Sequence, residues 1–259
     1  MKPIAFITGG TRGVGYEIVK KMIERDIFTI FTGRNIKTVR RMEQSFPTNN
    51  IMGMELDLTD LKSVENITNA LSLMKIRPNI IIHNAGYLST SPTETPFRLQ
   101  KLFLCNSISP ILLTQGMIPY IDKGHIFFFS PPSKIDDKVK FLTPYLQSKY
   151  SQTTYMKSLS HILKDKDISV NSIWTDYPLW TDAIRKRNIG NRIDCAHPSI
   201  IADMILEVID NEDPKVFKGN ELIDKDYLQK RNIHLDKYFY QKEHIKKLDN
   251  LFLSHLIKT

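Results

Sequence analysis

Near its N-terminus the chain reads Ile4-Ala5-Phe6-Ile7-Thr8-Gly9-Gly10-Thr11-Arg12-Gly13-Val14-Gly15. An apolar run typical of a buried strand is followed by a glycine-rich turn, and an amphipathic segment, 14–25, follows the turn directly. Glycine allows a tight turn, lets backbone N–H groups approach a phosphate, and lets the helix pack closely on the strand. We therefore expect a phosphate-binding turn between a strand and a helix; a plain tight turn is the alternative.

Short apolar runs alternate with helix-length segments along the rest of the chain. The predicted strands are 4–8, 28–32, 51–55, 80–83, 126–129, 168–173 and 221–223. The predicted helices are 14–25, 35–46, 61–74, 99–120, one opened by Thr143-Pro144, and 200–210. Because the strands are apolar throughout, helices should cover both faces of their sheet. The pattern predicts an α/β fold with one doubly wound, Rossmann-type domain and a mostly parallel, seven-stranded sheet flanked by helices.

Composition limits the class of protein. The 259 residues are 41% hydrophobic and 25% charged, which is typical of a soluble globular protein and excludes disorder, collagen and coiled coil. Cys105 and Cys195 lie far apart in the sequence, so we expect neither a zinc site nor a disulfide framework, and a reducing, cytoplasmic location. The charge-free stretch 102–121 contains too many polar residues and prolines for a transmembrane helix.

Two arginines lie where a nucleotide would meet the sheet. Arg12 is inside the glycine turn, and Arg34 directly follows the second predicted strand. A site selective for NAD usually has Asp or Glu at the end of that strand to hold the ribose hydroxyls, whereas Arg accommodates a 2′-phosphate. The sequence therefore favours NADP(H) over NAD(H). The alternative is that both are solvated surface arginines.

Five motifs, in this order and spacing, resemble the short-chain dehydrogenase/reductase family. They are the glycine turn 8–15, Asp57-Leu58, His83-Asn84-Ala85-Gly86, Asn106 and Tyr145-Leu146-Gln147-Ser148-Lys149. Ser130-Pro131-Pro132, 170–174, 200–203 and 217–220 with Ile223-Asp224 further resemble the hydroxysteroid dehydrogenase-like branch. Animal members of that branch add a sterol-carrier domain, for which we expect no room in this chain.

The resemblance implies a set of cofactor contacts. They fall on Gly9, Thr11, Arg12, Gly13, Val14 and Gly15 in the turn, on Arg34, on Asp57 and Leu58 at the adenine, on Asn84, Ala85 and Gly86 at the ribose, on Tyr145 and Lys149, and on Leu179 and Thr181 at the carboxamide. No metal is implied, and the histidines show no metal-ligand spacing. His83 stands where the family more often has asparagine, and we expect it to be structural.

The resemblance also implies the catalytic group. Tyr145 and Lys149 are four residues apart at the start of a helix, so their side chains leave one face. In the family pattern Tyr145 exchanges a proton with the alcohol or carbonyl, Lys149 holds the ribose hydroxyls, and Asn106 supports a water relay to Lys149. An exposed helix pair is the alternative.

The serine expected to polarise the carbonyl oxygen is less clear. Pro131 stands at its usual position and Ser130 is one residue earlier, where a strand side chain points to the opposite face. Ser130 serves if the chain turns it inward, and Ser133 is a second candidate. The segment 174–181 also lacks the Pro-Gly pair that is common in the family.

The leading functional hypothesis is an NADP(H)-dependent reductase or dehydrogenase acting on a carbonyl or alcohol. Tyr177, Trp180 and the loop 182–198 would line an apolar substrate pocket. The second hypothesis is a catalytically weakened relative that binds NADP(H) as a sensor or scaffold. The family resemblance implies a homodimer or homotetramer formed through the helices at 99–120 and 143–164.

The C-terminal segment is basic. The formal net charge is +8, and residues 225–259 contain half of the excess. We divide the chain into a catalytic domain, 1–240, and an amphipathic helix, 241–259, that docks on its own domain or on a neighbouring subunit. Membrane-surface attachment and nucleic-acid binding are the alternatives to docking, and we expect neither.

Overall fold

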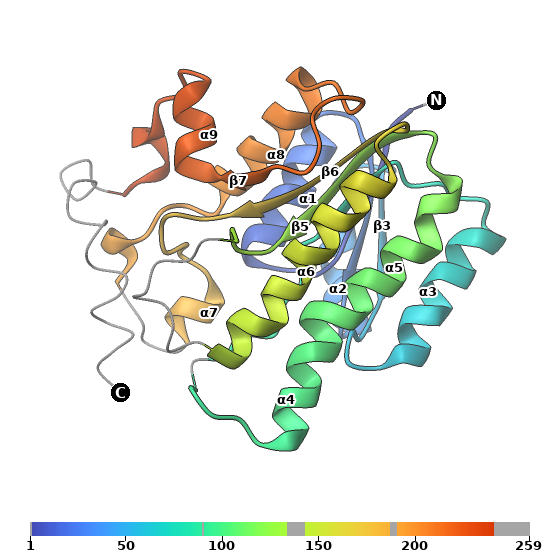
Figure 1. Ribbon diagram of the computed structural model, residues 1–259, viewed down its shortest axis with the longest axis horizontal. Helices are drawn as coiled ribbons and strands as arrows, with labels where there is room; N and C mark the ends of the chain where they lie inside the picture. The colour runs from blue at the N-terminus through green and yellow to red at the C-terminus, as the bar shows by residue number, and fades with distance from the viewer. Residues whose placement is uncertain (1, 90, 134–142, 187–190, 241–259) are drawn as a thin grey trace.

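The computed structural model describes residues 2–89, 91–133, 143–186 and 191–240 (Figure 1). Seven strands form one sheet in the order β3-β2-β1-β4-β5-β6-β7. The strands are β1 (Ile4–Ile7), β2 (Phe28–Gly33), β3 (Ile51–Glu55), β4 (Ile80–His83), β5 (Lys123–Phe129), β6 (Asp167–Trp174) and β7 (Glu221–Ile223). Every neighbouring pair is parallel, so the predicted α/β fold is confirmed and the sheet is all-parallel rather than mostly parallel.

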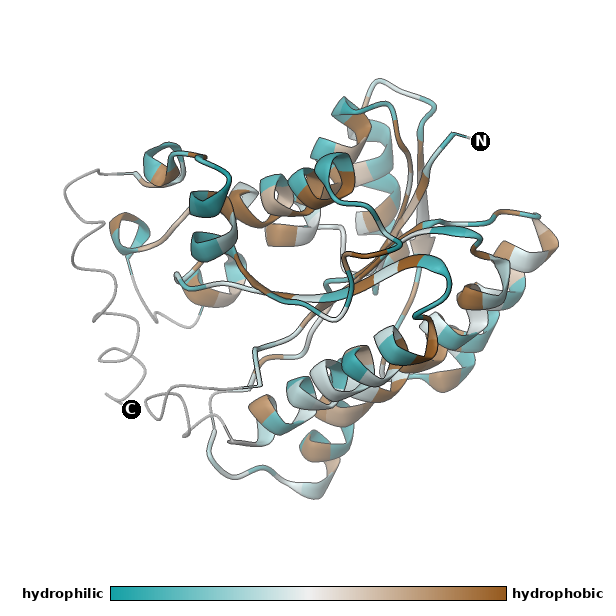
Figure 2. Cartoon of the chain, turned by 45° about the horizontal axis from the view of Figure 1, so that its top comes forward, coloured by the Kyte–Doolittle hydropathy of each residue, from teal (hydrophilic) through white to brown (hydrophobic). Residues whose placement is uncertain are grey.

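Helices cover both faces of the sheet (Figures 1 and 2). One layer contains α1 (Gly13–Glu24), α2 (Ile36–Ser45) and α8 (Ser199–Asn211). The other contains α3 (Leu61–Leu73), α4 (Pro96–Phe103), α5 (Ser109–Met117) and α6 (Thr143–Ile162). Shorter helices are α7 (Asp182–Arg185) and α9 (Asp224–Lys230), with single turns at Leu104–Ile108, Ile118–Tyr120, Arg192–Asp194 and Leu235–Tyr238.

Successive strand residues supply two separate cores, one under each helical layer. Ile7 and Phe31 belong to the core beneath α1, α2 and α8. Phe6 and Ile30 belong to the core beneath α3, α5 and α6. Side chains alternate between the two faces of a strand, so a strand buried on both faces has to be apolar at every position. This is why the strands appear in the sequence as unbroken apolar runs.

The helix predicted over 99–120 begins earlier and is not regular. Thr95 accepts a hydrogen bond from Arg98 N and precedes a proline, so α4 starts at Pro96. Between α4 and α5 the chain forms a π-helical turn, in which Ser109 N donates to Leu104 O, five residues back. The sequence pattern predicts a single long helix here, and the structure interrupts it with the π-helical turn.

Pro110 accounts for the interruption. In a regular α-helix the N–H of residue 110 would donate to Asn106 O, and proline has no N–H. Gln152 Nε2, from α6, donates to this carbonyl instead. Both Asn106 and Gln152 are fully buried, so the missing intrahelical bond is replaced by a contact between α6 and the π-helical turn.

The helical stretch Pro96–Tyr120 is long and apolar enough to cross a membrane by length and composition alone. In this fold it packs against α3 and α6. Its buried polar groups are bonded within the domain: Ser109 Oγ donates to Leu58 O at 2.7 Å, and the Thr114 hydroxyl lies 2.7 Å from His83 Nε2. These are the contacts of a helix inside a domain, as the sequence analysis expects. The amphipathic helix predicted at the C-terminus, 241–259, lies outside the described residues.

A buried carboxylate, Asp224, holds the chain that leaves β6. It accepts hydrogen bonds from the N–H groups of Asp176 (2.8 Å) and Lys225 (2.7 Å), and burial raises its pKa to about 6. The Thr175 hydroxyl lies 2.8 Å from Asp224 Oδ2 and 2.6 Å from Tyr177 O. A hydroxyl has one hydrogen and can donate to only one of these two oxygens. A protonated Asp224 completes the arrangement by donating to Thr175 while Thr175 donates to Tyr177.

Replacing Gln152 tests the bond to the freed carbonyl. Gln152→Leu removes the side-chain donor of the buried Asn106 carbonyl, and we predict a loss of about 1–2 kcal/mol in the free energy of unfolding. In a Pro110→Ala background, residue 110 has an N–H that can donate to this carbonyl. Gln152→Leu should then lower the free energy of unfolding by about 1 kcal/mol less than it does in the wild type. Urea unfolding of the wild type, both single variants and the double variant measures the coupling; strictly additive effects would contradict it.

Replacing Asp224 tests its protonation. Its folded-state pKa of about 6 lies above the value of about 3.9 for an unfolded aspartate. The stabilisation from this proton is therefore complete below about pH 4 and is lost as the pH rises through about 6. Asp224→Asn stays neutral, so we predict that its unfolding free energy improves relative to wild type by up to about 3 kcal/mol from pH 4 to pH 7. Denaturant unfolding at each pH measures the difference, and a constant difference would be the opposite result.

Candidate active site

The glycine turn lies at the carboxyl end of β1 and opens α1. Gly9 and Gly13 have φ angles of +69° and +57°, which residues with a side chain rarely adopt. A Cβ at Gly15 would lie 2.2 Å from Gly9 O, so only glycine fits there. The predicted tight turn is therefore present, and the N-terminus of α1 is at its end.

Asn84 joins the glycine turn to the end of β4. Its Nδ2 donates to Thr8 O at 3.0 Å and to Gly9 O at 3.1 Å, and Ala85 N donates to Thr8 Oγ1 at 3.1 Å. β1 and β4 are neighbours at the point where the strand order reverses direction. The crevice outside such strand ends is where ligands bind in open α/β sheets. Two predicted ribose-side residues thus lie against the predicted phosphate turn.

The chain that follows β6 returns to the glycine turn. A Cβ at Gly13 would lie 3.3 Å from Thr181 Cγ2, and the Arg12 guanidinium is 3.7 Å from the carboxylate of Asp182. Thr181 and Arg12 are therefore at the same edge of the sheet. Leu179 is different, because its side chain is buried in the core beneath α1 and α8.

Three more predicted contact residues have side chains that pack against the protein, partly buried for Thr11 and Val14 and buried for Leu58. Thr11 packs on the end of β2, where a Cβ at Gly33 would lie 2.5 Å from Thr11 Cγ2. Val14 packs against the core beneath α1. Leu58 is buried in the other core, and its carbonyl accepts the hydrogen bond from Ser109. The structure does not place the Leu58 side chain on the wall of an open site.

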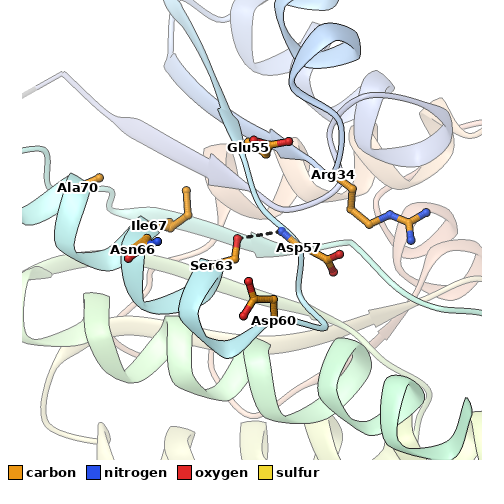
Figure 3. A pocket seen from close by; sticks show the side chains of 8 residues that line it. All are labelled: Arg34, Glu55, Asp57, Asp60, Ser63, Asn66, Ile67 and Ala70. Atoms are coloured by element: carbon orange, nitrogen blue, oxygen red, sulfur yellow. Dashed lines mark hydrogen bonds between the residues drawn. The ribbon is translucent and has the colours of Figure 1, made fainter. Parts of the chain in front are cut away.

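A hollow of about 540 Å³ opens beside the ends of β2 and β3 (Figure 3). Its lining residues are Arg34, Glu55, Asp57, Asp60, Ser63, Asn66, Ile67 and Ala70. Figure 3 shows Arg34 and Asp57 at one end of the hollow, with Asn66 and Ala70 at the other. The residues predicted for the 2′-phosphate and the adenine thus line one hollow.

Tyr145 and Lys149 lie one turn apart near the start of α6. Lys149 is 1% exposed, and its Nζ donates to Phe129 O at the end of β5, at 2.9 Å. A Cβ at Gly86 would lie 3.1 Å from this Nζ, so the chain after β4 passes close to the ammonium group. Burial lowers the pKa of Lys149 to about 8. The Tyr145–Lys149 pair and Gly86, predicted from two separate motifs, therefore lie at the same edge of the sheet, where β4 and β5 end.

Asn106 ties the chain after β4 to α6. Its Oδ1 accepts from Tyr87 N at 2.7 Å, and its Nδ2 donates to Tyr87 O at 2.9 Å and to Ser148 Oγ at 3.0 Å. Ser148 precedes Lys149, so Asn106 contacts the helix at the predicted catalytic pair. Its backbone carbonyl bonds Gln152, and the water relay stays a prediction.

Neither candidate serine is brought to Tyr145. Ser130 is fully buried, and its hydroxyl bonds that of Thr153 at 2.9 Å. Thr153 lies eight residues beyond Tyr145, about 12 Å along the helix. Ser133 bonds Lys157 Nζ at 2.6 Å, a further turn along α6. The strand pairing continues through Ser130 N to Ile173 O, and the Ser130 side chain is buried beside Thr153, so the structure does not support Ser130 as the polarising serine.

His83 is buried under α5. Its ring stacks on Phe128 with centroids 4.8 Å apart, and desolvation lowers its pKa to about 3. A neutral, enclosed imidazole bonded to Thr114 fits the expected structural role. The described residues contain no group of three or more His, Cys, Asp or Glu side chains arranged to hold a metal ion.

Sequence reasoning missed three residues around the site. Gln152 had a signal, since Pro110 falls four residues after Asn106 and marks a carbonyl without its helical donor. Asp182 and Glu55 had none, because only the folded loops place them beside Arg12 and in the hollow. Both add negative charge close to the two predicted arginines.

The groups present fit a dinucleotide. The turn would be filled by any side chain at Gly15, and it presents its backbone at the start of α1. The hollow on one side contains Arg34 and Asp57, and Lys149 lies on the other side, beside Gly86. The adenosine would meet the hollow, the pyrophosphate the glycine turn, and the nicotinamide ribose Lys149.

Comparison with curated proteins finds distant relatives. The short-chain dehydrogenase TIC 32 A, chloroplastic, of Brassica napus is 25% identical over 197 residues, which are 65% of this chain and 62% of that protein. Dehydrogenase/reductase SDR family member 13 of Bos taurus is 31% identical over 119 residues, 44% of this chain and 31% of that one. The chain thus spans about three fifths of the first of these relatives and about a third of the second.

Solved structures share this fold, and most of the chain matches one protein family. A short chain dehydrogenase from Mycobacterium thermoresistibile has a TM-score of 0.79 at 20% identity, over 92% of this chain and 90% of that one. A metagenomic short-chain oxidoreductase in complex with NADP has a TM-score of 0.71 at 20% identity, over 85% and 96%. The family described as short chain dehydrogenase matches residues 3–190. Since this match covers well over half of the chain, the protein belongs to the short-chain dehydrogenase family.

Proposed function

We propose that the protein is an NADP(H)-dependent oxidoreductase that exchanges a hydride with a carbonyl or alcohol substrate, with Tyr145 as the acid/base. The observation that carries the proposal is the place of the Tyr145–Lys149 pair. Both residues are on α6, and Lys149 Nζ lies between the ends of β4 and β5, at the edge of the sheet that holds the glycine turn. Membership of the family supports the same chemistry.

Tyr145 would transfer the proton, and Lys149 would stabilise its ionised form. When bound, the nicotinamide supplies or takes up the hydride. The Tyr145 hydroxyl would donate its proton to the substrate oxygen in reduction and become a phenolate; in oxidation the phenolate would accept the proton of the alcohol. A free phenol has a pKa of about 10, so work near neutral pH requires a shift of about 3 units, or roughly 4 kcal/mol. The Lys149 ammonium, one turn away, provides positive charge that favours the phenolate.

The preference for NADP(H) rests on two guanidinium groups. Arg34 lines the hollow and forms no ion pair among the described residues. Arg12 is in the turn, 60% exposed, with only the 3.7 Å contact to Asp182. Both are free to meet phosphate oxygens. Structures of this fold have been solved with NADP and, for a 4-hydroxyisoleucine dehydrogenase mutant, with NADH, so the fold itself accommodates either nucleotide.

A second candidate function is a catalytically weakened family member that binds NADP(H) as a sensor or scaffold. One observation favours it: the described residues place neither Ser130 nor Ser133 where a substrate oxygen would meet Tyr145. Tyr177, predicted to line the substrate pocket, is also buried, with its ring against Phe239 at 4.9 Å. Both findings weaken the prediction that these residues bind and polarise a substrate.

Further proposals concern the setting of the protein. We propose a homodimer or homotetramer formed through the helices at 99–120 and 143–164; the first of these exposes Leu99, Ile108 and Leu112. A cytoplasmic location, a small-molecule substrate and a place in the hydroxysteroid dehydrogenase-like branch likewise stay proposals. We expect neither nucleic acid nor membrane as a partner.

Titration with NADPH and with NADH, followed by nucleotide fluorescence, tests the cofactor, and a carbonyl panel tests turnover. We predict tighter binding of NADPH than of NADH, and a loss of about 100-fold or more in turnover for Tyr145→Phe with cofactor binding largely intact. Tyr150→Phe, on the same helix and outside the pair, is the control. Full activity of Tyr145→Phe would contradict the mechanism. Binding of NADPH without turnover of any panel member would favour the sensor.

A further inference from the structure

The hollow beside β2 and β3 contains more negative than positive charge. Among the described residues that line it, Arg34 is the one cation, and Glu55, Asp57 and Asp60 are carboxylates (Figure 3). No ion pair joins these carboxylates to a cation within the described part of the chain. A 2′-phosphate in this hollow would therefore be repelled by three carboxylates and attracted by one guanidinium group.

Each of the three carboxylates is fixed in place by a backbone N–H. Asp60 Oδ1 accepts from Lys62 N at 3.0 Å and caps α3, and Asp57 Oδ1 accepts from Thr59 N at 2.8 Å. Glu55 Oε1 accepts from Ile36 N at 3.3 Å, at the start of α2. Because Asp60 caps a helix and Asp57 closes a turn, Glu55 is the carboxylate whose charge is least needed by the fold.

Glu55 is also the carboxylate most closely tied to the chain around Arg34. Glu55 and Gly33 are paired in the register of β2 and β3, and Arg34 follows Gly33 directly. The hydrogen bond to Ile36 N places the Glu55 carboxylate against the connection from β2 to α2, two residues beyond Arg34. Both side chains are exposed, so a ligand at the end of β2 meets the guanidinium and the carboxylate together.

We propose that Glu55 is a second determinant of cofactor choice, acting against Arg34. In sites selective for NAD a carboxylate at the end of the second strand accepts hydrogen bonds from the ribose hydroxyls, and an arginine there accommodates the 2′-phosphate. This chain has the arginine after β2, and β3 supplies a carboxylate to the same hollow. Arg34 raises the affinity for a 2′-phosphate, and Glu55 lowers it and favours free ribose hydroxyls. The inference rests on the proposed cofactor site.

Glu55→Gln separates charge from position. The amide oxygen of Gln still accepts from Ile36 N, so the connection that contains Arg34 stays in place while one negative charge is removed. We predict that the ratio of the dissociation constants of NADH and NADPH shifts toward NADPH by roughly three- to tenfold, the size expected for one exposed charge near a phosphate dianion. The affinity for 2′,5′-ADP relative to that for ADP should rise by a similar factor. Both fragments lack the nicotinamide, so they report on the adenosine end of the site alone.

Glu65→Gln is the matched control. Glu65 is on α3 outside the hollow, in an exposed ion pair with Lys62 at 3.0 Å, and should leave both ratios unchanged. Dissociation constants from calorimetry at two salt concentrations give the result, with thermal unfolding to show that each variant is folded. An unchanged ratio in Glu55→Gln, equal changes for both nucleotides, or weaker NADPH binding would each overturn this inference while leaving the cofactor site intact. Wild-type protein that binds none of the four nucleotides would overturn the proposed function and this inference together.

Discussion

The two hydrogen bonds from Asn84 Nδ2 to the carbonyls of Thr8 and Gly9 join the strand ends at which the sheet reverses its order. A turn rich in glycine has little conformational preference of its own, because glycine loses more backbone entropy on folding than other residues. An external tether must therefore hold it. By using both amide hydrogens on neighbouring carbonyls, Asn84 fixes the turn against β4, and the path of the chain past Lys149 follows from the same strand end.

The opposite wall of the site depends on how α6 is held. Two hydrogen bonds of described residues fix the position of α6 against the sheet and the π-helical turn. Lys149 bonds the end of β5, and Gln152 bonds the carbonyl that Pro110 leaves without a donor. A proline in a buried helix usually costs free energy. Here the lost helical bond is exchanged for one between two elements, which orders Tyr145 and Lys149 relative to the sheet.

The fold was predictable from the sequence because its main signals are local. Apolar runs mark the strands, and the caps Asn35 and Asp60 mark helix starts within a residue or two of the predicted ones. The predicted turn, Asn84 and Lys149 lie at one edge of the sheet for the same reason: parallel strands bring their carboxyl ends together. The directions of side chains were harder to predict. The side chains of Ser130 and Leu179 are buried because of strand and bridge pairing that no sequence motif shows.

Charge was the least predictable feature, because its effect depends on distance. The net charge of +8 and the two arginines favoured a site that attracts anions. Exposed charges interact over about one Debye length, roughly 8–10 Å at physiological salt, so remote lysines contribute little at the hollow. The fold places three carboxylates in the same hollow as Arg34, from β3, the turn that follows it and the start of α3. The local balance at the ribose end is therefore opposite in sign to that of the whole chain, and it is the local balance that a phosphate meets.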